Sequence, residues 1–171
     1  MEEQVTSHII KGLVLGIISV FISVVVHTFN LYENPYVSSV SYGVFMIGII
    51  YSTILFANQN GNKVGFGNIF AHGFKTSAVV IVITVFYTVL AVKLIFPEFI
   101  DITLNISRKR IETSPNVPKD AVQKNLDFMR EYFLPFAIGM TVIILGFFGL
   151  ISSLIGAAVA KKNTNPFENQ A

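Results

Sequence analysis

The chain contains no cysteine, which excludes disulfide frameworks, thiolate metal sites and cysteine nucleophiles and leaves the redox compartment open. Charge is also scarce: only 13% of the 171 residues are charged, against about 25% in an average soluble domain. The hydrophobic share is 53%, and the mean hydropathy is +0.65. So little polar surface cannot cover a water-soluble globule, and the composition therefore indicates a membrane protein. The formal net charge of +2 is too small to suggest a nucleic-acid partner.

Motifs of enzymatic chemistry are lacking as well. HExxH, GxSxG and P-loop spacings are absent, and the glycines of the segment 64–73 (VGFGNIFAHG) are only a weak signal. No Asp or Glu lies in the long apolar segments, so neither a carboxylate proton relay nor a cation site is supported there. We therefore expect no enzymatic activity, no cofactor and no metal, and we assign no catalytic, cofactor-binding or metal-ligating residue.

Four long apolar segments are present instead, at about 12–29, 37–57, 76–96 and 136–160. Their only Asp, Glu, Lys or Arg is Lys93, close enough to the end of the third segment for its ammonium to reach the interface. A helix rises about 1.5 Å per residue, so roughly 20 apolar residues cross a hydrocarbon layer about 30 Å thick. The sequence predicts an all-α membrane protein, with four transmembrane helices in a bundle that forms a single domain over residues 1–171.

The first apolar segment could instead belong to a cleaved signal peptide. Glu2 and Glu3 stand where such a peptide needs positive charge, the apolar run is too long, and no small-x-small cleavage site follows it. These features favour an uncleaved transmembrane helix.

The connection between the third and fourth spans, 97–132, is long and holds more than half of the charged residues. Its second half predicts an amphipathic helix that starts near Pro118 and carries Val122, Leu126, Met129 and Phe133 on one face. The segment 99–107 is ambiguous, because isoleucines and a leucine alternate with polar residues as in a strand. A strand beside a bilayer has unpaired edges, so we favour a helix that continues beyond the third span.

Small residues form continuous helical faces in two spans. The first span carries Gly12, Gly16, Ser19 and Ser23, followed by His27; the fourth carries one face with Gly149, Ser153 and Ala157 and another with Ser152, Gly156 and Ala160. Because helices in lipid associate mainly through close packing, we interpret these faces as contacts within the bundle or between subunits. The alternative is a polar pathway to which His27, Ser77, Thr84 and Thr88 contribute. The position of His27 near the end of its span favours a group at headgroup level over a proton carrier.

The segment 66–75 precedes the third span and carries both His72 and Lys75. Phe66, Phe70 and Phe74 recur at a spacing of four, which is typical of one apolar helix face. We interpret the segment as an interfacial helix that merges into the span, with His72 and Lys75 at the bilayer edge rather than in an active site.

Three sequence motifs occur in a characteristic order: FGNIFAHGFK before the third span, FPEFID after it, and a small-residue-rich final span that ends in Lys161 and Lys162. In this order, from about Ile9 to Lys162, the chain resembles the bacterial integral membrane family catalogued as domain of unknown function 4199. The resemblance implies a four-helix membrane protein with no established activity, and it supplies no functional residues.

These observations lead us to expect an integral membrane protein of unknown biochemical activity, most consistent with a non-enzymatic structural, accessory or partner-binding bundle. Its expected partners are membrane lipids and either a second copy of the chain or another membrane protein. The alternative function is a small transporter or channel with a polar route lined by spans 1 and 3. We expect the bacterial cytoplasmic (inner) membrane as the location.

Orientation follows from the basic residues. Four spans place both termini on one side, which carries Lys11, Lys63, Lys75, Lys161 and Lys162, while the other side carries Lys93, Arg108, Lys109, Arg110, Lys119, Lys124 and Arg130. The plain count favours the second side as cytoplasmic. The positive-inside rule, however, weights basic residues next to spans, and Lys161 and Lys162 directly follow the fourth span. We therefore predict cytoplasmic termini and an external connection 97–132.

Overall fold

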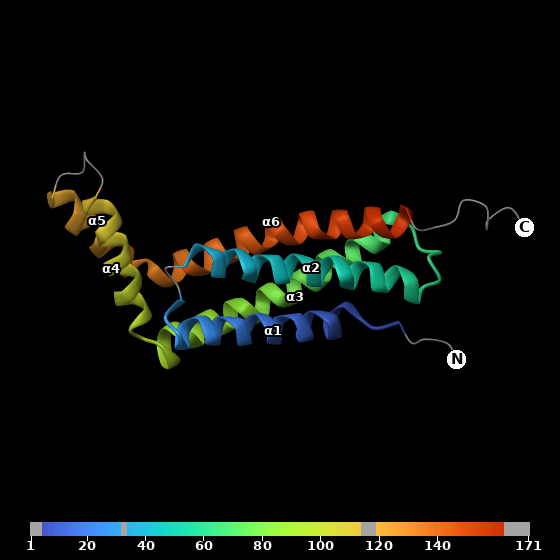
Figure 1. The fold of residues 1–171 in the computed structure, drawn as a ribbon, viewed down its shortest axis with the longest axis horizontal. Coiled ribbons are helices and arrows are strands. Elements are labelled where there is room, and N and C mark those ends of the chain that lie inside the picture. The colour runs from blue at the N-terminus through green and yellow to red at the C-terminus, as the bar shows by residue number, and fades with distance from the viewer. Residues whose placement is uncertain (1–4, 32–33, 114–118, 163–171) are drawn as a thin grey trace, which may run out of the picture. The chain divides into compact units, whose positions relative to one another are not determined.

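The structure, a computed structural model, describes residues 5–31, 34–113 and 119–162. In chain order its elements are α1 (His8–Thr28), α2 (Pro35–Gln59), α3 (Phe66–Leu90), the π-helical turn η2 (Ala91–Ile95), α4 (Phe99–Glu112), α5 (Lys119–Glu131) and α6 (Phe133–Lys162) (Figure 1). The described ranges contain no strand, which confirms the all-α prediction. Contacts divide the chain into two compact units: unit 1 comprises 1–84 and 141–171, and unit 2 comprises 85–140. The prediction of one membrane domain over the whole chain stays a prediction.

Within the part of the chain that the structure describes, four helical segments are long and apolar enough to cross a membrane: His8–Thr28, Ser39–Gln59, Phe66–Ile95 and Phe133–Lys161. They correspond to the four predicted spans, but the third begins ten residues earlier than predicted. The reason lies at Gly65, whose carbonyl accepts hydrogen bonds from the N–H groups of Asn68 (3.1 Å) and Ile69 (3.2 Å) and so starts the helix. The segment 66–75 is therefore helical and continuous with the span.

The turns reverse the chain with short polar residues. Ser7 caps α1 by accepting a hydrogen bond from the Ile10 N–H at 3.3 Å. Between α2 and α3, Gly61 and Asn62 adopt positive φ angles of 60° and 58°, a conformation that glycine and asparagine tolerate best. The Asn62 N–H donates to the Ala57 carbonyl at 2.9 Å and closes the end of α2. The end of α2 and the start of α3 therefore lie at the same end of unit 1.

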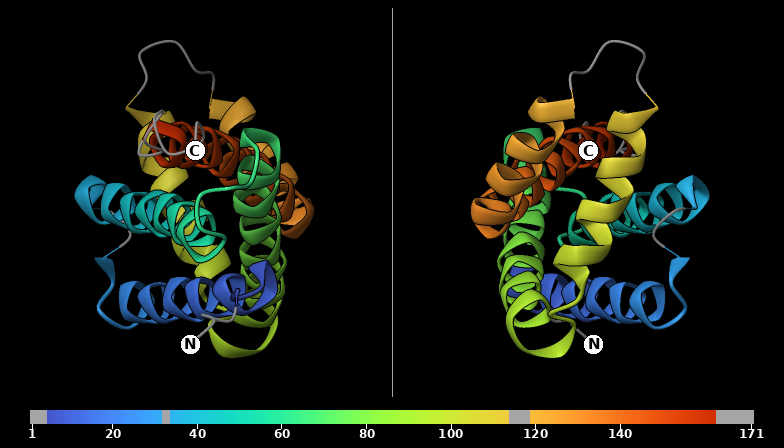
Figure 2. Two further views of the ribbon diagram at one scale, coloured as in Figure 1. Left: turned by 90° about the vertical axis from the view of Figure 1, so that its right-hand side faces the viewer. Right: turned by 90° about the vertical axis from the view of Figure 1, so that its left-hand side faces the viewer.

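Unit 1 is a bundle of α1, α2 and the parts of α3 and α6 that belong to it. In the end-on view, α1 and α6 lie on opposite sides of the α2–α3 pair (Figure 2). One buried cluster contains Phe45, Ile49 and Val80, with Leu15 and Phe148 packed against it. A second, at the end where α6 finishes, contains Ala57, Ile69, Ala157 and Ala160.

Unit 2 contains the hairpin of α4 and α5. Leu104, Val122 and Leu126 form its buried cluster, with Ile100, Ile111 and Met129 packed against it. The ambiguous segment 99–107 is helical, as the sequence favoured, because Ile100 and Leu104 fall on one helix face and bury against α5. The prediction that this helix continues the third span is wrong, because η2 ends at Ile95 and α4 begins only at Phe99, after a turn at Pro97 and Glu98. The predicted amphipathic helix is α5, described from Lys119 onward; Pro118 lies outside the described residues. The helix ends at Glu131, so Phe133, which was predicted on the same face, begins α6 instead.

Candidate functional site

The glycines of α6 that the sequence assigns to packing lie where helices of unit 1 approach closely. A Cβ atom added at Gly149 would lie 2.6 Å from Oγ and 2.7 Å from Cβ of Ser77 in α3. A Cβ atom added at Gly156 would lie 2.8 Å from Cβ of Thr53 in α2. Each glycine therefore lets two helices approach more closely than alanine would. The other members of the two α6 faces, Ser152, Ser153, Ala157 and Ala160, are buried.

The glycines of α1 lie against α3 in the same way. A Cβ atom at Gly12 would lie 2.6 Å from Cβ of Val79, and one at Gly16 would lie 2.5 Å from Cδ1 of Ile83. The contact between α1 and α3 thus depends on the absence of side chains at these two positions.

The polar groups considered for a pathway are bonded to their own helices. On α1, Ser19 donates to the Leu15 carbonyl (2.9 Å), Ser23 to the Ser19 carbonyl (3.0 Å), and His27 Nδ1 to the Ser23 carbonyl (2.9 Å). On α3, Thr84 donates to the Val80 carbonyl at 2.9 Å. Thr88 belongs to unit 2. These bonds direct the donors along the helix backbone rather than across the bundle.

A polar cluster missed by the sequence analysis lies at the end of unit 1 where α1 and α3 begin. Lys11 is only 8% exposed, and its Nζ donates to the Ser52 carbonyl (3.4 Å) and to Gln59 Oε1 (3.3 Å). The same Nζ lies 5.8 Å from the ring centroid of Phe56, within the range of a cation–π contact. The residues of unit 1 that the structure describes include no Asp or Glu. Uncharged oxygens and an aromatic ring therefore surround this ammonium group.

His72 completes the cluster from α3. Its side chain is 6% exposed and stacks on the Phe56 ring with centroids 3.9 Å apart. The ring also meets His8 edge-on at 6.0 Å, and among the described residues its buried Nε2 has no hydrogen-bond partner. Gln59 ties α2 to the residue before the α1 cap, because its Nε2 donates to Thr6 Oγ1 at 3.1 Å. The cluster thus joins the ends of three helices.

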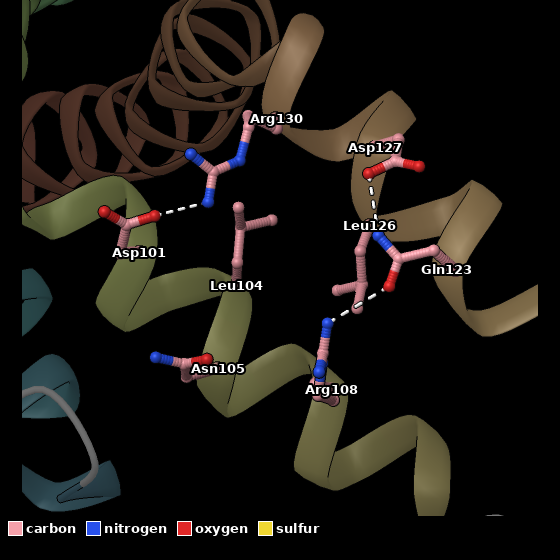
Figure 3. Close-up of a pocket in the computed structure, with 8 residues that line it drawn as sticks. All are labelled: Asp101, Leu104, Asn105, Arg108, Gln123, Leu126, Asp127 and Arg130. Atoms are coloured by element: carbon pink, nitrogen blue, oxygen red, sulfur yellow. Dashed lines mark hydrogen bonds and ion pairs between the residues drawn. The ribbon is translucent and has the colours of Figure 1, made fainter.

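A second polar feature is the groove between α4 and α5 in unit 2 (Figure 3). The groove is lined by Asp101, Leu104, Asn105 and Arg108 of α4 and by Gln123, Leu126, Asp127 and Arg130 of α5, and it encloses about 80 Å³. At one end Arg130 pairs with Asp101. At the other, Arg108 donates to Gln123 Oε1 (3.2 Å), and Gln123 Nε2 donates to Asp127 Oδ1 (2.9 Å).

The charges of this groove remain in contact with water. The side chains of Arg130 and Asp101 are 61% and 58% exposed. Such exposed ion pairs contribute about 0–1 kcal/mol to stability, so they can exchange partners at little cost. The groove can therefore offer both signs of charge to another molecule. Within the described ranges, no group of three or more His, Asp or Glu side chains is placed to hold a metal ion.

The sequence as a whole was compared with known proteins. A family model described as "Protein of unknown function (DUF4199)" matches residues 11–162. The chain belongs to the DUF4199 family. Comparison with curated proteins and with solved structures found no match. The match confirms the resemblance noted in the sequence, and it gives this DUF4199 protein no assigned activity.

The polar cluster of Lys11, Phe56, Gln59 and His72, which we call the Lys11 cluster, was only weakly indicated by the sequence of this DUF4199 protein. Lys11 directly precedes the packing face that starts at Gly12, and His72 stands four residues before Thr76. Its members come from α1, α2 and α3 and meet only in the folded bundle. Local spacing therefore could not predict the pairing.

Proposed function

We propose that this DUF4199 protein is a non-enzymatic, multi-pass protein of the bacterial cytoplasmic membrane that presents the α4–α5 groove to another protein. The observation that carries the proposal is the construction of the hairpin. Leu104, Val122 and Leu126 are buried between its helices, while the charged side chains of the groove stay exposed. An apolar cluster beneath a polar surface holds that surface in a fixed shape, which is what recognition requires.

The dimensions of the groove favour protein side chains over a small molecule. Pockets for small ligands usually enclose about 300–1,000 Å³ and are mostly apolar. This groove encloses about 80 Å³ and is lined by charged and amide groups. One or two polar side chains of a partner fit such a volume, and the paired charges can give the contact its register.

The transporter alternative needs polar side chains that face a route through the bundle. Ser19, Ser23 and His27 instead bond to carbonyl groups of α1, which supports a packing role. Purified protein in liposomes separates the two functions. Solute flux above that of empty liposomes, lost in a Ser23→Ala variant that still folds, would favour transport; flux equal to that of empty liposomes would favour the proposal.

The proposal includes an orientation with the termini in the cytoplasm and the groove outside. On the terminal side of unit 1, exposed Lys63 lies in the turn before α3 and exposed Lys161 lies at the end of α6, and the described part of that unit contains no acidic residue. Basic residues close to spans favour the cytoplasmic side.

Photo-crosslinking in intact cells tests the partner. A photoreactive side chain at Asn105 faces the groove, whereas the matched control at Arg110 is exposed on the opposite side of α4. We expect a defined protein adduct from position 105 that is much weaker from position 110. Asp101→Arg reverses one charge of the groove and should reduce the adduct. Equal adducts from both positions, or none from either, would contradict the proposal.

A further inference from the structure

The outer side of α5 carries a row of exposed aromatic residues that runs into α6. Phe128, Tyr132 and Phe136 recur every four residues and are 61%, 46% and 69% exposed. Backbone hydrogen bonds link them in order, from the Tyr132 N–H to the Phe128 carbonyl and from the Phe136 N–H to the Tyr132 carbonyl, each 3.0 Å. The three side chains therefore share one helical face, which we call the outer aromatic face. The rings of Phe128 and Tyr132 touch, with centroids 4.7 Å apart.

The hairpin does not use this face for its own packing. At about 100° per residue, Phe128 lies about 160° around α5 from Leu126, which belongs to the buried cluster. It lies about 140° from Gln123, which lines the groove. Helix α5 thus has an apolar side against α4, a polar side at the groove, and an outer side whose aromatic rings lie uncovered.

Its continuity with a membrane span identifies the occupant as lipid. Phe136 and Met140 (41% exposed) belong to the candidate span Phe133–Lys161, and an exposed apolar face of a span contacts hydrocarbon. Tyr132 lies one helical turn before Phe136, about 6 Å along the helix, which is close to the thickness of a headgroup layer. Tyrosine, with an apolar ring and a polar hydroxyl, is enriched at this level.

The charge at the far end of the face also fits phospholipid. Lys124 is exposed one turn before Phe128, so the row reads cation, two aromatic rings, then hydrocarbon-facing residues. Lys124 lies twelve residues before Phe136, about 18 Å along a straight helix, so its side chain meets lipid phosphates when α5 lies along the membrane surface. Asn125 and Glu131 border the face and are exposed, which keeps its edges polar.

We propose that the outer aromatic face of α5 inserts into the phospholipid headgroup layer of the bilayer that α6 crosses, with Lys124 on the lipid phosphates. This binding goes beyond the proposed partner recognition, because it uses a different side of α5. It holds the hairpin at the membrane surface and leaves the groove side open.

The chain contains no tryptophan, so a single substitution introduces a selective fluorescent probe. The full-length Phe128→Trp and Tyr132→Trp variants are reconstituted into vesicles of phosphatidylcholine and phosphatidylglycerol, with Gln123→Trp on the groove side as the matched control. We expect both aromatic-face variants to emit at shorter wavelength than the control and to be quenched severalfold more strongly by brominated phosphatidylcholine. Quenching of the Phe128→Trp variant should increase when phosphatidylglycerol is added to phosphatidylcholine vesicles. In the double variant with Lys124→Gln, this increase should be smaller.

Two results would overturn the inference. In the first, the Phe128→Trp and Tyr132→Trp variants match the Gln123→Trp control in emission and in quenching by aqueous iodide, which places the face in water. In the second, emission shifts to shorter wavelength without quenching by brominated lipid, which means that a second copy of the chain covers the face. Two aromatic-face variants are used so that misfolding of one leaves the test intact.

Discussion

Gly149 and Ser77 make the close contact between α6 and α3, and little room is left there for a side chain. Gly149→Leu should force the helices apart and destabilise the bundle by about 1–3 kcal/mol, and Ala157→Leu should act likewise because Ala157 is fully buried. Thermal unfolding in detergent micelles measures the effect. Ile143→Leu is the control, since Ile143 is 67% exposed. Equal stability of all three variants would contradict the packing interpretation.

His27 tests whether the polar face of α1 has a proton-linked role. An imidazole changes charge between pH 5 and 8, whereas glutamine does not. His27 Nδ1 donates to the Ser23 carbonyl, a bond that the amide of glutamine can replace. His27→Gln should therefore leave stability and growth phenotype unchanged from pH 5 to 8, compared with wild type across the same range. A loss confined to one part of this pH range would favour the transport alternative.

Individual residues were predictable where one helix determines their surroundings. The faces with Gly12 and Gly149 follow from spacing alone, because spacing places residues on one side of a helix. The contacts of Lys11 and His72 were not predictable from the sequence, because their surroundings come from three different helices. The sequence pattern indicates that His72 lies at the bilayer edge, but it does not reveal that the His72 ring is buried against Phe56. Side-chain partners of this kind depend on how helices pair, which one sequence does not specify.

At the level of elements, two variants of the α4–α5 hairpin distinguish how much apolar packing and how much surface charge contribute to its stability. Leu126 is 4% exposed, so Leu126→Ala should leave a cavity and cost about 2–5 kcal/mol. Arg130→Ala removes an exposed ion pair and should cost less than about 1 kcal/mol. Hydrogen exchange of backbone amides in α4 and α5 of the full chain measures both. A larger loss of protection from Arg130→Ala than from Leu126→Ala would contradict the view that apolar packing maintains the groove.

The spans were the most predictable elements, because about twenty residues without charge have few alternatives to crossing a membrane. Their ends were less so: α3 begins at Phe66, since His72 and Lys75 do not interrupt helical hydrogen bonding. The segment 99–107 was ambiguous because its alternating pattern also contains the helical spacing of Ile100 and Leu104. Only the cluster with Val122 and Leu126 distinguishes the two readings. Burial against a neighbouring element therefore decided what local pattern could not.

At the level of the whole molecule, the account rests on four helices that cross the membrane. The four candidate spans support this arrangement, and an even number of spans puts both termini on one side. The groove and the outer aromatic face both belong to unit 2, so the proposed partner recognition and the proposed lipid contact would take place on the side of the membrane where the 97–132 connection lies.

Reporter fusions measure this arrangement most directly. One reporter is fused after Ala171 and another is inserted within 114–118, each in a form that is active on only one side of the membrane. The account predicts a cytoplasmic reporter at the C-terminus and an external reporter in the 97–132 connection. An external reporter at the C-terminus with a cytoplasmic reporter in the connection would refute the predicted orientation but would still agree with four spans. Both reporters on the same side would contradict the central claim that α6 crosses the membrane between them.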